Sequence, residues 1–158
     1  MLIRLLPDQI SKFWPIIKYA VEQSLPPIVG EHPDKMNRIL SSALCGKIDV
    51  WVSYIKEKNN KIEGIILTEF LFDEPSGTKN MLIYCLYGYE DIADESWLYG
   101  ISGLAKYAQS RQCNQIVTYS DIPYMIDLAK QIGGEAKYTF ISFDVNQIVS
   151  NLNDLNGG

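Results

Sequence analysis

Four acidic side chains stand close together near the middle of the chain, and no basic residue is near them in sequence. They are Glu90, Asp91, Asp94 and Glu95, and the segment from Asn80 to Ala105 contains no Lys or Arg. Convergent carboxylates can hold a divalent cation or a basic group of a partner. The alternative is helix capping beside a solvated loop, because Asp and Glu are common where helices begin.

The chain has one histidine and three cysteines. His32 lies in a proline-rich loop, where it can act as a general base or simply be solvated. Cys45, Cys85 and Cys113 are odd in number and widely spaced, which favours reduced, packed thiols over disulfides or a zinc site. A metal site needs three or four convergent ligands. His32 and the three cysteines form no close-spaced set, so we expect no metal.

Aromatic residues gather around the acidic segment. Tyr84, Tyr87 and Trp97 fit core packing, whereas Tyr89 and Tyr99 are harder to bury by pattern. Tyrosine is enriched at the centres of protein contacts. We therefore predict Tyr89 and Tyr99 as interface residues.

A strand, a loop and a helix must position these residues. The apolar run Met81–Tyr87 predicts a central strand covered on both faces. A helix follows, capped by Asp94, and residues 115–119 form the next strand. The crossover makes the two strands parallel, and ligands in such units sit where the strand ends and the helix begins.

The remaining pattern predicts a mixed sheet. Short turns join the middle strands, so those strands are antiparallel, and helices join the later ones. The order β-α-α-β-β-β-α-β-α-β indicates an α/β (α+β) fold with helices on both faces of a central sheet. Further elements are a strand over 1–6, a helix over 7–24 that either kinks at Pro15 or starts later than Pro7, a helix over 33–46, strands over 49–56 and 62–72 with a bulge at Gly64, a helix over 122–132 and a last strand over 137–145.

We divide the 158 residues into one domain of residues 1–145 and a C-terminal tail of residues 146–158. Ile148, Leu152 and Leu155 in the tail are spaced like a weak amphipathic helix and are further interface candidates. A net charge of −5 argues against nucleic-acid and anionic-membrane surfaces. The N-terminus does not begin a signal peptide and no apolar run is long enough to span a bilayer, so we expect a soluble, cytoplasmic protein.

The order of elements over residues 1–145 resembles the GNAT fold of acetyl-CoA-dependent N-acetyltransferases. Residues 82–89 and 131–134 are also similar to small GNAT-like proteins of tailed bacteriophages, which implies host cytoplasm or a virion as location. The resemblance places acetyl-CoA beside Cys85, Leu86, Tyr87 and Trp97.

Two marks of the working enzymes are absent from the sequence. Their turn after the fourth strand carries Gln or Arg and two small residues, chiefly glycine, whose backbone N–H groups receive a pyrophosphate. Here residues 89–97 contain neither glycine nor Arg but several carboxylates, which repel phosphate. The tyrosine expected four residues before a Gly-Phe pair, which protonates the departing thiolate in the family, is also missing. Tyr124 lies on the same helix and is a catalytic candidate that could reach the site only from a different turn.

The sequence therefore favours a GNAT-fold binding or accessory module without acetyl transfer, acting through a protein partner or as a homo-oligomer and needing no cofactor. The alternative is a divergent acyltransferase that uses acetyl-CoA on an amine. In that case Glu69, Glu90 or Asp91 would serve as the base, and a backbone N–H at the end of the 81–87 strand would stabilise the oxyanion. A third possibility is a polyamine or basic peptide bound without chemistry.

Overall fold

The computed structural model describes residues 1–157, and two compact units divide the chain at Tyr119 and Ser120. The first unit carries a five-stranded sheet in the order β1-β2-β3-β4-β5. Its strands are β1 (Leu2–Arg4), β2 (Ile48–Ile55), β3 (Lys61–Asp73), β4 (Thr78–Gly88) and β5 (Gln115–Thr118). Neighbours from β1 to β4 are antiparallel, and β4 pairs with β5 in parallel. The mixed α/β sheet predicted from the sequence is thus confirmed.

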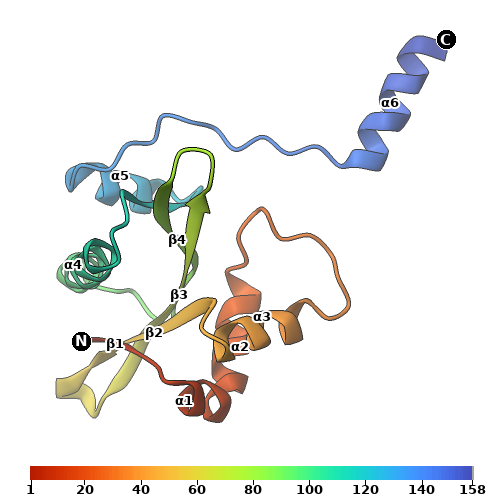
Figure 1. The fold of residues 1–158 in the computed structure, drawn as a ribbon. Coiled ribbons are helices and arrows are strands. Elements are labelled where there is room, and N and C mark those ends of the chain that lie inside the picture. Colours follow the sequence, from red (N-terminus) through yellow and green to blue (C-terminus); the bar gives the residue numbers. More distant parts are fainter. Residues whose placement is uncertain (158) are drawn as a thin grey trace. The chain divides into compact units, whose positions relative to one another are not determined.

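Helices cover both faces of this sheet (Figure 1). They are α1 (Pro7–Lys12), α2 (Trp14–Gln23), α3 (Lys35–Leu44) and α4 (Asp94–Ser110), and a short 3-10 turn, Lys56–Lys58, joins β2 to β3. The first three helices pack on one face and α4 packs on the other. The predicted kink is real, because the helical pattern breaks at Phe13, just before Pro15.

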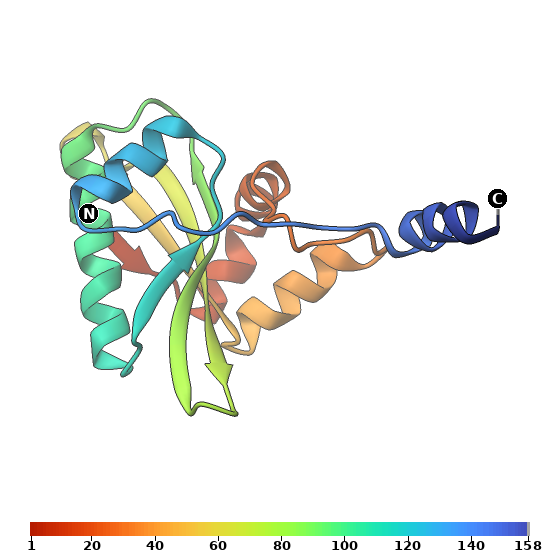
Figure 2. The same cartoon turned by 90° about the horizontal axis from the view of Figure 1, so that it is seen from above.

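Alternation along the strands builds two separate cores. Val50 and Leu67 face α1–α3 and are fully buried, whereas Trp51, Ile66 and Met81 face α4. Figure 2 shows α4 lying along the sheet on its own face. The close approach of α4 explains one of its two glycines, since a Cβ on Gly103 would meet the Leu2 side chain at 3.3 Å.

A buried hydrogen bond stabilises the α4 face of the sheet. Trp51 Nε1 donates to Thr68 Oγ1 at 2.9 Å, and the two residues are 7% and 1% exposed. Thr68→Val keeps the shape but removes the acceptor, so we expect the free energy of unfolding in urea to fall by about 1–2 kcal/mol. Thr68→Ser keeps the hydroxyl and serves as control. A Thr68→Val variant as stable as the parent would show that this bond contributes nothing.

The second unit contains α5 (Pro123–Gln131) and α6 (Val145–Gly157). The predicted end of α5 is confirmed, because Gly133 has φ +94° and the Gly134 N–H donates to the Ala129 carbonyl at 2.9 Å. The predicted strand over 137–145 is wrong, since residues 137–144 belong to no strand. Alternation alone supplies no partner strand, and Asp144 caps α6 by accepting from the Gln147 N–H at 2.9 Å.

Of the smaller details predicted from the sequence, some are confirmed and others differ. Ala93, not Asp94, is the N-cap of α4, and Asp94 is its first helical residue. Cys85 is buried and Cys113 half-buried as predicted, but Cys45 is exposed. Between β2 and β3 the register shifts so that Glu63 has no partner residue, which confirms the bulge expected at the adjacent Gly64. The boundary predicted at residue 145 stays a prediction.

Candidate functional site

A bulge in β4 decides which side chains reach the face covered by α2 and α3. Leu67 of β3 pairs with Cys85, but the next residue, Thr68, pairs with Ile83, so Tyr84 is the extra residue. Beyond the bulge the alternation of faces is reversed. Cys85 and Tyr87 therefore turn to the α1–α3 core, although Met81 and Ile83 of the same strand face α4.

The same point of β4 is where its partner on the other side stops. The β4–β5 pairing runs from Asn80 with Gln115 to Ile83 with Thr118. Past Ile83, the first unit provides no strand beside residues 84–88 on that side. Backbone N–H and C=O groups at a strand edge can bind an extended ligand in the manner of an added strand.

Three tyrosines meet at the end of β4. The rings of Tyr19 and Tyr87 lie edge to face with centroids 5.9 Å apart, and those of Tyr87 and Tyr89 lie likewise at 5.0 Å. The Tyr89 hydroxyl donates to the Ile16 carbonyl at 3.4 Å. A hydrogen bond with Tyr19 raises the pKa of Tyr87, with burial a lesser cause. This cluster packs α2 against the C-terminal end of β4, the part of the strand that lies past the pairing with β5.

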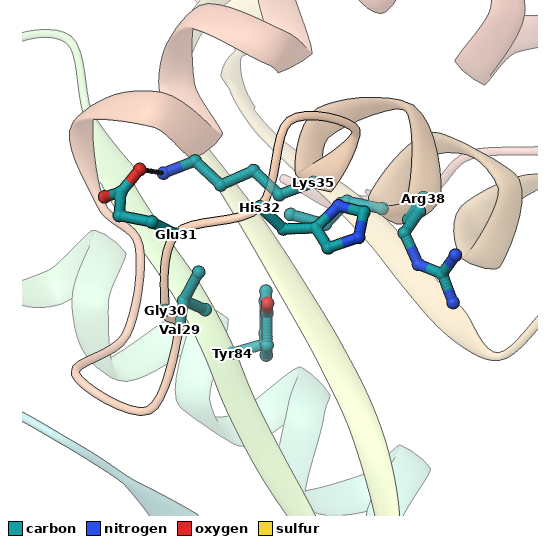
Figure 3. A pocket seen from close by; sticks show the side chains of 8 residues that line it. Val29, Gly30, Glu31, His32, Lys35, Arg38 and Tyr84 are labelled. Atoms are coloured by element: carbon teal, nitrogen blue, oxygen red, sulfur yellow. Dashed lines mark hydrogen bonds and ion pairs between the residues drawn. The ribbon is translucent and has the colours of Figure 1, made fainter. Parts of the chain in front are cut away.

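A shallow hollow of about 350 Å³ lies between α3, the loop before it and β4 (Figure 3). Its lining consists of Val29, Gly30, Glu31, His32, Lys35, Arg38, Ile39 and Tyr84. Lys35 Nζ lies 3.5 Å from Glu31 Oε2, which leaves Arg38 as the cation of the hollow without an ion pair among residues 1–157. The hollow is therefore weakly basic rather than acidic.

His32 presents a donor rather than a base to this hollow. Its Nδ1 accepts a hydrogen bond from the Asp34 backbone N–H at 3.1 Å. The proton of the neutral ring is then on Nε2, because one ring nitrogen donates and the other accepts. The general-base role considered for His32 is not favoured by this geometry, although the loop does place the ring at the cleft (Figure 3).

Glu69 lies on the same face of the sheet as Tyr84. It pairs with Leu82 across the β3–β4 ladder and lines a second hollow of about 430 Å³ with Ser42 and Lys47. Burial raises the pKa of the Glu69 carboxyl above its usual value of 4.5. The pKa of Tyr84 is also raised, chiefly by burial, then by the charges of Cys85 and Glu69. The two side chains thus belong to one electrostatic environment.

The acidic turn after β4 is not left to carboxylates alone. Lys61, at the start of β3, forms an ion pair and hydrogen bond with Glu90 and lowers the pKa of that carboxyl, with a smaller contribution from the charge of Lys58. The turn also has an apolar anchor, because Ile92 Cδ1 lies against Gly64 and Gly88. The turn is therefore closed by its own side chain and partly neutralised by the β2–β3 connection.

The fold brings some of the predicted residues together. Cys85, Leu86, Tyr87 and Tyr89 follow one another at the end of β4, and Glu90 and Asp91 lie in the turn beyond. On α4, Trp97 is half-buried and Tyr99 is 59% exposed. In the second unit, Tyr124 lies in the first turn of α5, and α6 carries Ile148, Leu152 and Leu155. The predicted catalytic and interface roles of these residues stay predictions.

Sequence reasoning missed four residues of the site. Tyr84 was counted only as core, and the contributions of Arg38, Lys58 and Lys61 were not foreseen. A signal for the lysines existed, since β3 starts where its antiparallel partner β4 ends, which places Lys61 near Glu90. No comparable signal pointed to Arg38, because its position depends on how α3 packs.

The Cys85 thiol gives a direct test of the packing behind the bulge. Burial raises its pKa to about 12, opposed by a hydrogen bond with Ser24. We expect Ellman's reagent at pH 8 to modify Cys45 at once and Cys85 only on unfolding. Because the thiol ionises near pH 9 when unfolded, its contribution to stability is complete below pH 9 and is lost as the pH rises toward 12. Fast labelling in a native variant that carries both Cys45→Ser and Cys113→Ser, in which Cys85 is the remaining thiol, would contradict this packing.

Solved structures share this architecture. A predicted acetyltransferase with acetyl-CoA from Clostridium acetobutylicum superposes with a TM-score of 0.68 at 14% identity, covering 93% of this chain and 97% of its own. The chain has the acetyltransferase fold. A ribosomal-protein-alanine N-acetyltransferase from Brucella melitensis gives a TM-score of 0.63 at 14% identity over 91% and 99% of the two chains.

A third structure with the acetyltransferase fold is an aminoglycoside acetyltransferase from an uncultured soil metagenomic sample in complex with sisomicin. Its TM-score is 0.62 at 18% identity, covering 91% of this chain and 93% of its own. No family model and no curated protein matches the sequence. Within residues 1–157, no helix is long and apolar enough to cross a membrane, and no group of His, Cys, Asp and Glu is arranged to hold a metal.

Proposed function

We propose that this protein is an N-acyltransferase that uses an acyl-CoA thioester, acetyl-CoA in the first instance, to acylate an amine. The observation that carries the proposal is the end of β4, where the Tyr84 bulge and the end of the β5 pairing coincide at a strand edge that no other strand of the first unit pairs with. The three solved structures described above carry the name acetyltransferase, one of them with acetyl-CoA, which favours transfer over pure binding.

The chain supplies a place for each part of such a reaction. The thioester lies along residues 84–88, where backbone N–H groups can stabilise the oxyanion that forms when the amine attacks the carbonyl carbon. Attack forms the C–N bond and the oxyanion, which then collapses to the amide as the C–S bond breaks, and the thiolate takes a proton from water. Glu69 accepts the proton that the amine loses, directly or through a water molecule, since its burial keeps its basicity above that of an ordinary carboxylate.

The acidic turn limits how tightly the nucleotide binds. Lys61 neutralises Glu90, but Asp91 is exposed just before α4 and Glu95 is exposed in its first turn, and Ala93 offers no capping side chain. The N–H groups of that turn still attract phosphate, as at other helix N-termini. The balance of these opposing charges predicts weak, salt-sensitive binding of acetyl-CoA.

The acidic turn also supports a second candidate, a binding or accessory module that has lost the reaction. The turn carries no glycine and is held shut by Ile92 over Gly64 and Gly88. In that case the exposed apolar side chains of α6, Leu152 and Leu155, serve a protein partner or a second copy. A role in a phage particle belongs to this candidate.

Calorimetric titration with acetyl-CoA, combined with thiol release on a panel of primary amines, separates the two candidates. We expect a dissociation constant in the micromolar to millimolar range and thiol release that depends on the amine. No heat of binding and no amine-dependent thiol at 1 mM acetyl-CoA would reject transfer in favour of the binding module.

A further inference from the structure

The hollow beside Tyr84 presents hydrogen-bond donors to whatever enters it. Arg38 brings a guanidinium without an ion pair in the part of the chain that the structure describes, and His32 brings Nε2–H because Asp34 occupies its other ring nitrogen. Figure 3 shows the His32 ring beside Arg38, with Tyr84 on the strand that forms the floor. Donors of this kind match a carboxylate.

The net charge of the residues that line the hollow indicates how much negative charge a bound anion should carry. Lys35 and Arg38 contribute two positive charges, and Glu31, held by Lys35, contributes one negative charge. The remainder is a single positive charge in about 350 Å³. That remainder balances a monoanion such as a carboxylate, whereas a doubly charged phosphate would leave an excess of negative charge.

Tyr84 connects this hollow to the reacting groups. It lines the hollow, is the extra residue of the β4 bulge, and shares the electrostatic environment of Glu69. A small molecule anchored by its carboxylate at Arg38 therefore lies in contact with Tyr84, the first of the strand residues that we propose to bind the thioester. Its amine then reaches the position from which it attacks the thioester.

We propose that the acceptor is an amino acid or similar small amine bearing a carboxylate, which Arg38 binds in the hollow formed by the loop before α3, α3 itself and Tyr84. This inference rests on the proposed acyl transfer, because it specifies the acceptor of that reaction. It replaces the view that an acidic cleft selects a polyamine or a basic peptide.

The test compares each of the twenty common amino acids with its own amide. In the thiol-release assay with acetyl-CoA, we expect at least one amino acid to exceed its amide in kcat/KM by about tenfold. Arg38→Gln should bring that ratio close to one, Arg38→Lys should restore part of it, and the exposed Lys106→Gln on α4 should leave it unchanged. Equal rates for amino acids and amides, or an unchanged ratio in Arg38→Gln, would overturn the inference while transfer itself stands.

A binding measurement keeps the inference testable even without turnover. We expect the amino acids at 10 mM, and not their amides, to shift the NMR signals of the Arg38 Nε–H and the His32 ring in the folded chain. No shift with any of the twenty would overturn the carboxylate site. A shift without thiol release, and without acetyl-CoA binding, would support the site and reject the proposed transfer.

Discussion

Glu69→Gln is expected to lower kcat for acetyl transfer by about a hundredfold to a thousandfold. The substitution keeps the size of the side chain but removes the half-buried carboxylate whose charge contributes to the raised pKa of Tyr84. Binding of acetyl-CoA should be unchanged, because Glu69 lies on the face of the sheet next to α3 rather than at the turn after β4. The measurement is single-turnover thiol release beside calorimetric titration.

The pH dependence of the reaction provides a second readout of Glu69. A base must be ionised, and burial places its pKa above 4.5, so activity should fall as the pH drops through that raised pKa. In Glu69→Gln the part of the acid limb of kcat/KM that reports this carboxyl should disappear, so that only the ionisation of the amine substrate remains. Glu57→Gln, in the exposed turn between β2 and β3, is the matched control and should retain both rate and acid limb. A Glu69→Gln variant with full activity would move the base elsewhere, with Asp91 the next candidate.

Gly64→Ala is expected to destabilise the fold by about 3 kcal/mol and to weaken acetyl-CoA binding. A Cβ at this position would lie 2.9 Å from the Tyr87 carbonyl oxygen and 3.5 Å from Ile92 Cδ1. Backbone cannot yield as a flexible side chain does, so β3 and the end of β4 must separate. Urea unfolding and calorimetric titration measure the two effects.

Gly100→Ala is the opposite case and the natural control for Gly64→Ala. Gly100 lies within α4, and a Cβ there would meet nothing within 4 Å. Alanine is the better helix former, so the variant should be more stable than the parent by about 1 kcal/mol. Equal effects at the two glycines would show that the close approach of β3 and β4 is not what makes Gly64 necessary.

Most of the fold was predictable from hydrophobic periodicity and from the proline and glycine residues that end helices. Pro15 located the break between α1 and α2, and Gly133 located the end of α5, because each residue restricts the backbone locally. The strand predicted over 137–145 failed for a physical reason. A strand exists only when another pairs with it, and alternation of side chains cannot show whether a partner is present.

The candidate site was less predictable because it depends on register. The run from Met81 to Tyr87 is apolar throughout, so no alternation marked Tyr84 as the residue where the faces exchange. No basic residue lies near the acidic turn in sequence, but a lysine that is distant in sequence lies beside it in the fold. Pairing of β3 with β4 brings Lys61 to Glu90 across the sheet.

The coincidence of bulge and site also fixes the length of the strand that leads to it. Removing one residue between the β3–β4 hairpin and Tyr84 would exchange the two faces for everything downstream, sending Tyr87 toward α4 and Leu86 toward α2. Homologous chains should therefore vary in length at the hairpin tip, residues 74–77, and never between residues 79 and 84. The number of residues between the hairpin and the bulge of β4 thus decides which side chains face the site. Insertions and deletions should be tolerated only at the hairpin tip, where they leave that number unchanged.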